Sequence, residues 1–260
     1  MKQDYHCSGS GAITGGEYGE IRVSGGAKMT GDVQCDRLHV SGGVKAANDL
    51  TCGEMHVSGS LKVEGRLSAE TAKISGEVKA EKGIAISGSL SLSGSLKTEG
   101  NAELGEAGIS GGATVEGKIN AKDLRVSGGL KCGSDVSAEH FASSGKVEIP
   151  GLLNAETIEL SASGRSEIGD IGCGSLTVRK ERNVFFFGDA KPGLTVRSIE
   201  GDTIWLENTV AEIVRGKNVT VGKHCKIGRV EYSETLNLVD GGKVEEQVRE
   251  IGRASCRERV

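Results

Sequence analysis

Apolar residues recur along this chain in pairs spaced two apart, and the pairs themselves recur about every 17 residues. A Ser-Gly step, usually preceded by an apolar residue, marks the phase of the repeat. The serines are 17 residues apart, or 18 at one step, and they are Ser24, Ser41, Ser58, Ser75, Ser93, Ser110, Ser127 and Ser144. A phase kept over so many intervals indicates a repeat architecture.

Each repeat holds three apolar pairs, separated by glycine, serine or acidic residues. A spacing of two is the period of a β-strand, in which alternate side chains share one face. One repeat therefore predicts one triangular coil of three short strands. The residues that we expect to form the interior ladder are Val33, Cys35, Leu38, Val40, Leu50, Cys52, Met55, Val57, Leu61, Val63, Leu67 and Ile74.

One coil cannot bury its apolar face alone, so the coils must stack on one another. The pattern therefore predicts an all-β protein, a parallel β-helix solenoid of 17-residue coils. An extra residue between Ile84 and Ser93 predicts a bulge at a corner. Glycines follow the serines, and we expect them to supply positive φ angles at the corners. These corner glycines are Gly25, Gly42, Gly59, Gly76, Gly94, Gly111, Gly128 and Gly145.

The regular pattern ends near residue 178 and divides the chain. We predict about ten coils over residues 1–178, a connector over 179–193 and a smaller strand-rich C-terminal subdomain over 194–250. Phe185, Phe186 and Phe187 in the connector could form a docking or membrane patch, but a plug between two stacks is the favoured interpretation. Residues 243–250 could begin a short capping helix. Residues 251–260 read like a translated sequencing adaptor and are left out of this reasoning.

Composition narrows the class of protein. There are 41 glycines but only 2 prolines, without a three-residue period, which excludes collagen. No apolar run is long enough for a membrane helix, and the start lacks an apolar signal segment, so we expect a cytoplasmic protein that meets a membrane only through partners. The formal net charge of −4, with acids and bases mixed, argues against nucleic acid as a partner.

Candidate chemistry is sparse. No two cysteines have the C-x-x-C spacing of a zinc site. Cys35 and Cys52 share an inward column, where we expect reduced thiols although a disulfide would be within reach. His39 and His56 share an outward column, either as a solvated ladder or as a weak metal site. The sequence has no phosphate-binding loop, nucleophile elbow or catalytic acid cluster, so we predict no enzyme activity, no cofactor and no metal.

Three alternatives remain open. Residues 221–228 resemble two hexapeptide repeats of left-handed β-helix acyltransferases, with His224 as the base. A polysaccharide-acting β-helix enzyme would need a groove with clustered acids. A monomeric binding rod would present a lysine ribbon to an anionic polymer, unless each lysine is neutralised by a glutamate two residues on. The ribbon is Lys28, Lys45, Lys62, Lys79, Lys97 and Lys131, and the glutamates are Glu64, Glu81, Glu99 and Glu116.

The period, the Val-Ser-Gly-Gly corners, coils such as residues 57–70 and the absence of loops together resemble the bactofilins, over about residues 8–178. Bactofilins are bacterial cytoskeletal proteins that form polymers. The resemblance implies a right-handed β-helix that polymerises end to end without nucleotide and organises cell shape, cell wall or motility. The chain departs from typical members in its longer stack, its scarcity of proline and its lack of an apolar N-terminal segment.

The physics of a stack also favours self-association, since each end exposes unpaired strand edges and a slice of core. We expect the chain itself to be the main partner, with the membrane surface or cell-wall machinery as further candidates. At the N-terminal end, Ile13, Ile21 and Val23 are the candidate contact residues. In the alternative, residues 1–7 and the C-terminal subdomain cap both ends and leave a monomeric rod.

Overall fold

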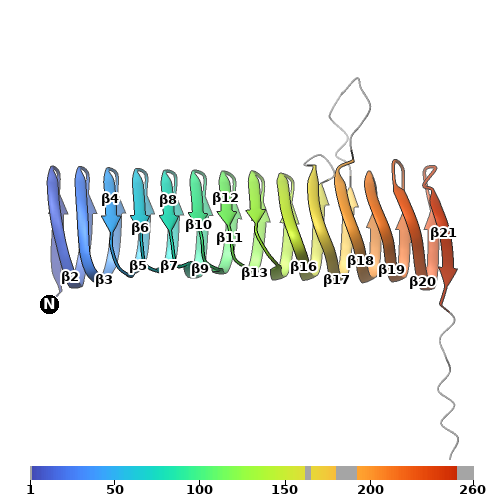
Figure 1. Cartoon of the computed structure of the whole chain (residues 1–260), viewed down its shortest axis with the longest axis horizontal. Coiled ribbons are helices and arrows are strands. Elements are labelled where there is room, and N and C mark those ends of the chain that lie inside the picture. Colours follow the sequence, from blue (N-terminus) through green and yellow to red (C-terminus); the bar gives the residue numbers. More distant parts are fainter. Residues whose placement is uncertain (1, 162–164, 180–191, 251–260) are drawn as a thin grey trace, which may run out of the picture.

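A computed structural model describes residues 2–161, 165–179 and 192–250. Within these residues the protein consists of 21 strands and no helix. The strands stack along one long axis as a solenoid of about 14 turns (Figure 1). All strands belong to one sheet, and neighbouring turns pair in parallel. The predicted all-β parallel solenoid is therefore confirmed.

The strands alternate between long and short along most of the chain. Before residue 162 they are β1 (Gln3–Cys7), β2 (Ser10–Val23), β3 (Gly26–Val40), β4 (Gly43–Ala46), β5 (Leu50–Val57), β6 (Ser60–Val63), β7 (Leu67–Ile74), β8 (Glu77–Ala80), β9 (Ile84–Leu92), β10 (Ser95–Thr98), β11 (Ala102–Ile109), β12 (Gly112–Val115), β13 (Ile119–Val126), β14 (Gly129–Cys132), β15 (Val136–Ser143) and β16 (Lys146–Ser161). After it they are β17 (Ser166–Arg179), β18 (Leu194–Leu206), β19 (Thr209–Val221), β20 (Lys226–Leu238) and β21 (Val244–Arg249).

Turns pair with a constant offset over most of the rod. Leu50 of β5 pairs with Leu67 of β7, which in turn pairs with Ile84 of β9. Each long strand bends near its middle, so its buried residues fall into two pairs, and the short strand supplies a third. The twelve predicted ladder residues are all buried, with at most 5% of their surface exposed.

The extra residue in the repeat is absorbed by β9, which has nine residues where β7 and β11 have eight. The register shifts between Ala69 and Ala72 on one side and between Leu104 and Glu106 on the other. Both shifts fall at the bend of the long strand. The predicted corner bulge is therefore confirmed, and the neighbouring turns keep their register beyond it.

The corner glycines serve a purpose different from the predicted one. None of the eight has a positive φ. Instead, a Cβ on any of them would lie less than 3.0 Å from a backbone carbonyl oxygen of the preceding turn. At Gly42, the oxygens in the way are those of Ser24 and Gly25. Glycine is needed there because adjacent turns approach too closely for any side chain.

The C-terminal strands continue the same stack. β18 pairs with β17 from Ser166↔Leu194 to Val178↔Leu206, across the connector. The next offset is shorter, since Leu194 pairs with Thr209. Corners in this part use left-handed residues instead of a Ser-Gly step: Asn208, His224 and Asp240 have φ angles of 49°, 58° and 52°. Residues 180–191, including Phe185, Phe186 and Phe187, lie outside the described residues.

The predicted start of a capping helix at residues 243–250 is wrong. Val244–Arg249 form strand β21, which pairs in parallel with residues 227–232 of β20. The edge of β20 offers a row of backbone donors and acceptors, and a strand satisfies them whereas a helix would not.

Candidate functional site

Two tyrosines cover the N-terminal end of the core. Tyr5 lies in register with Ile21, and Tyr18 lies in register with Cys35, so both occupy inward columns. Both rings pack against the core. Their hydroxyl groups donate to backbone carbonyl oxygens of β2, Tyr5 to Ala12 at 3.2 Å and Tyr18 to Thr14 at 2.9 Å. The rings thus close the end of the core, while the hydroxyls bind carbonyls close to the strand edge.

The three residues predicted to form the end-to-end contact lie beneath this cover. Ile13, Ile21 and Val23 are 1%, 0% and 0% exposed. They cannot contact another molecule directly unless the tyrosines move. The sequence carried a signal for this cover, because inward columns that otherwise hold small or aliphatic residues hold aromatic ones in this turn.

The opposite end of the described stack is open. β21 pairs only with residues 227–232 of β20, so within the described residues no strand lies against the outer edge of residues 233–238. Leu238 continues the inward column of Val221, and Leu236 continues that of Val219. Leu238 is 45% exposed. This end therefore presents core-type leucines beside an unpaired strand edge.

The predicted lysine ribbon is balanced by acids, but across turns more than within them. Lys45 lies 2.9 Å from Glu64, Lys62 lies 3.0 Å from Glu81, and Lys79 lies 3.0 Å from Glu99. In each pair the glutamate belongs to the following turn. The contacts within a turn are longer, 3.9 Å for Lys62 and Glu64. The result is a diagonal ladder of ion pairs, which weakens the case for a ribbon that grips an anionic polymer.

The surface carboxylates predict how stability responds to acid. Hydrogen bonds from basic side chains, or from the Leu152 backbone in the case of Asp135, lower the pKa of Glu20, Glu64, Glu99, Asp123, Asp135, Glu148, Asp170 and Glu231. A lowered folded-state pKa stabilises the fold above the unfolded-state value and is lost as pH falls. We expect the thermal midpoint, followed by circular dichroism, to hold near neutrality and fall from about pH 5 to about pH 2. A midpoint unchanged over that interval would contradict this assignment.

Acidic and amide side chains also complete the backbone pairing at one corner, which the sequence analysis missed. Asp49 Oδ1 accepts from the backbone N–H of Arg66 at 2.8 Å, and Asn101 Oδ1 accepts from that of Lys118 at 3.0 Å. Asp135 does the same for Leu152 at 3.1 Å. The recurrence of Asp or Asn at one phase of the repeat was the available signal.

The histidines and cysteines form no larger cluster. The rings of His39 and His56 are stacked with centroids 5.1 Å apart, and Glu54 lies 3.0 Å from His56. His224 is exposed in the turn between β19 and β20. Six cysteines are free thiols, five of them buried. Among the described residues there is no group of three or more side chains suited to a metal ion.

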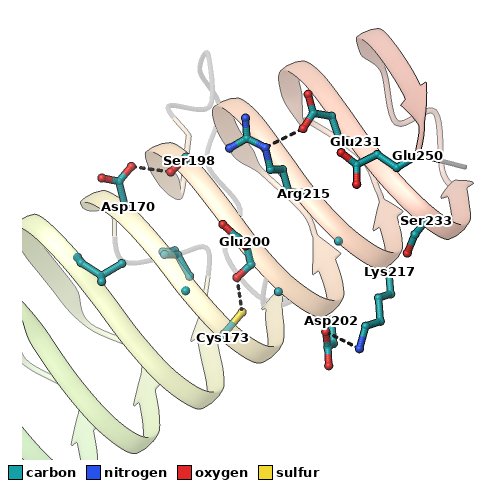
Figure 2. Close-up of a pocket in the computed structure, with 15 residues that line it drawn as sticks. Asp170, Cys173, Ser198, Glu200, Asp202, Arg215, Lys217, Glu231, Ser233 and Glu250 are labelled. Atoms are coloured by element: carbon teal, nitrogen blue, oxygen red, sulfur yellow. Dashed lines mark hydrogen bonds and ion pairs between the residues drawn. The ribbon is translucent and has the colours of Figure 1, made fainter. Parts of the chain in front are cut away.

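The largest hollow is an open groove of about 660 Å³ across β17, β18, β19 and β20 (Figure 2). One inward column explains its depth, since the position held by Ala155 and Cys173 becomes glycine at Gly201 and Gly216. A Cβ at Gly216 would come within 2.9 Å of Val219 and 3.0 Å of Ile204. The wall lies close against the core there, which leaves the outer face hollowed.

Acids dominate the groove, but most of them are held in bonds. Ser198 donates to Asp170 at 2.6 Å, Lys217 lies 2.9 Å from Asp202, and Arg215 donates to Glu231 at 2.7 Å (Figure 2). Asp170 also pairs with Arg197. These contacts lower the pKa of Asp170 and of Glu231. A general acid in glycoside hydrolysis needs a raised pKa, so neither carboxyl group suits that role.

No helix in the described part of the chain has the length and apolarity needed to span a bilayer. No protein-family model matches the chain. The chain is similar to two uncharacterized proteins of Bacillus subtilis (strain 168): YhbF, with 38% identity over 100 residues, and YhbE, with 41% identity over 101 residues. Each alignment covers 38% of this chain, and it covers 42% of YhbF and 43% of YhbE. The chain thus matches less than half the length of these relatives.

A solved structure, the C-terminal domain of a tapirin from Caldicellulosiruptor kristjanssonii, aligns over 97% of this chain and 93% of its own. The identity is 10% and the TM-score is 0.26. The similar proteins leave the function open, and the case for it therefore depends on the geometry of the rod and its ends.

Proposed function

We propose that the chain is a structural, non-enzymatic scaffold that assembles end to end without nucleotide, in the manner of a bactofilin. The observation that carries the proposal is the contrast between the two ends. Tyr5 and Tyr18 cover the core at one end, whereas Leu236 and Leu238 stand beside an unpaired strand edge at the other. Joining open ends of two molecules would bury these leucines and extend the backbone ladder.

The shape of the rod supports the same proposal. Its described turns are joined by short corners, and the outward faces carry ladders of ion pairs. Charged ladders discourage pairing along the sides and so direct contact to the ends. The cellular role that follows from the resemblance is organisation of cell shape, wall synthesis or motility at a cytoplasmic site, reached through partner proteins.

A charge at the open end should weaken assembly. Burying a leucine side chain contributes about 1.5–3 kcal/mol, so Leu238→Asp should weaken the end contact by about tenfold or more. The matched control is Asn237→Asp, which adds the same charge one residue away on the outward face. Assembly of residues 1–250, which include every described strand, is followed by sedimentation and negative-stain electron microscopy.

The expected result is unbranched fibres or paired rods for the wild type and the control, and single rods for Leu238→Asp. Single rods for the wild type at all concentrations would refute self-assembly. Equal loss in both variants would mean that added charge, and not the leucine contact, controls association.

The groove favours a second candidate, a polysaccharide-acting β-helix enzyme, since five carboxylates line it: Asp170, Glu200, Asp202, Glu231 and Glu250. Of these, Glu200 is exposed and has no side-chain ion pair among the described contacts. Release of new reducing or unsaturated chain ends from a linear polysaccharide, abolished by Glu200→Gln, would establish this candidate in place of the scaffold.

A further inference from the structure

We propose that Cys35 and Cys52 form a reversible redox site, in which a peroxide joins the two thiols in a disulfide between adjacent turns. The site lies in the regular part of the rod, between β3 and β5. It does not depend on the proposed scaffold function, and nothing in the groove or at the ends takes part in it.

The register of the strands brings the two thiols together. Cys35 and Cys52 are direct partners in the parallel pairing of β3 with β5. Adjacent strands lie about 4.8 Å apart, which falls within the range of about 4.4–6.8 Å between the Cα atoms of a disulfide. Both side chains point inward in the same column, with 5% and 4% of their surface exposed. The backbone therefore needs little movement to close the bond.

The pair is distinct from the other cysteines in β-strands. The column partners of Cys7 include Val23, that of Cys132 is Val115, and those of Cys173 are Ala155 and Gly201. The next residue in the column after Cys52 is Ala69. Register therefore allows one cysteine pair to form in these strands.

A small oxidant can reach the pair. Cys52 lines an open cleft of about 440 Å³ at the bend of the long strands, beside Ser68, Ala69 and Leu104. The two thiols also interact directly, and this interaction together with burial raises the pKa of the Cys52 thiol. Because the thiolate is the reactive form, oxidation should be slow at neutral pH and should accelerate as the pH is raised.

The chemistry balances with hydrogen peroxide as the oxidant. One thiolate attacks the peroxide, an S–O bond forms, the O–O bond breaks and hydroxide leaves, which gives a sulfenic acid. The second thiol then attacks this sulfur; the S–S bond forms, the S–O bond breaks and water leaves. In total, two thiols and one peroxide give one disulfide and two waters. A dithiol reductant reverses the step by thiol–disulfide exchange.

The test uses the full chain. The protein is treated with hydrogen peroxide, free thiols are blocked with N-ethylmaleimide, and a tryptic digest is analysed without reduction. Cys35 lies in the peptide of residues 29–37, and Cys52 lies in that of residues 46–62. We expect these two peptides to appear as one cross-linked species that dithiothreitol separates, with two of the 7 thiols lost to blocking. The oxidised protein should also unfold at a higher temperature than the reduced one.

Variants assign the bond. Cys35→Ser and Cys52→Ser should each abolish the cross-link, whereas Cys132→Ser, at a buried thiol in another column, should retain it. The wild-type digest decides the proposal even if a variant fails to fold. Alkylation or over-oxidation of both cysteines without a cross-link would overturn it, as would a cross-link that joins either residue to a different cysteine.

Discussion

Alanine at Gly42 is expected to destabilise the solenoid by about 3 kcal/mol, because it places a methyl group where the preceding turn already lies. The new Cβ would stand 2.6 Å from the carbonyl oxygen of Ser24 and closer still to that of Gly25. Both are backbone atoms that cannot rotate away. The turns would have to separate, at the cost of the bonds from Gly43 N to Gly25 O at 2.9 Å and from Gly42 N to Val23 O at 3.2 Å.

The adjacent glycine supplies the matched control. A Cβ at Gly43 would meet no atom within 4 Å, and its φ is not in the left-handed region. Gly43→Ala should therefore leave stability unchanged or raise it by about 0.4–1 kcal/mol through the unfolded state. Urea unfolding followed by circular dichroism measures both variants. If the two alanines cost the same, close approach of the turns is not what fixes glycine at this corner.

Phe141→Ala is expected to cost about 3–5 kcal/mol, because it removes the bulkiest of the fully buried side chains. Phe141 is 1% exposed in β15 and stands in register between Leu124 and Ile158. Backbone hydrogen bonds fix the distance between turns, so the neighbours cannot collapse into the space. Phe141→Leu retains most of the apolar volume and should cost about 1 kcal/mol.

Hydrogen exchange would locate the effect of Phe141→Ala. Each turn of a solenoid contacts only its neighbours, so protection should fall in β13, β15 and β16 and persist near β5 and β7. Uniform loss of protection along the whole rod would show instead that the stack unfolds as one cooperative unit. No loss at all would mean that the turns do adjust around the cavity.

The repeat predicted the fold because it reports burial directly. Positions such as Leu61 and Val63 recur as inward pairs, and the period then allows only stacked coils. The same reasoning gave the wrong reason for Gly42, because a sequence shows that a side chain is absent but not which atom excludes it. It also missed Phe141 as a core residue, since one aromatic in a column of aliphatics carries no periodic signal.

The candidate sites were less predictable, because they depend on contacts between turns. The pairing of Lys62 with Glu81 crosses from one turn to the next and competes with the closer sequence neighbour Glu64. The groove beside Gly201 and Gly216 results from two glycines in one inward column, in turns whose offsets are no longer 17 residues. The cover formed by Tyr5 and Tyr18 needs a ring to lie across the end of the core, which composition alone does not reveal.

The constant offset between turns makes this rod a ruler whose length follows from the number of repeats. β6, β8, β10 and β12 all pair through the same four positions, so the upper face of one turn matches the lower face of any other. A gene can therefore gain or lose whole repeats by recombination while every remaining column realigns. Length can change in steps of one strand spacing, about 4.8 Å, while the cross-section and both ends stay as they are.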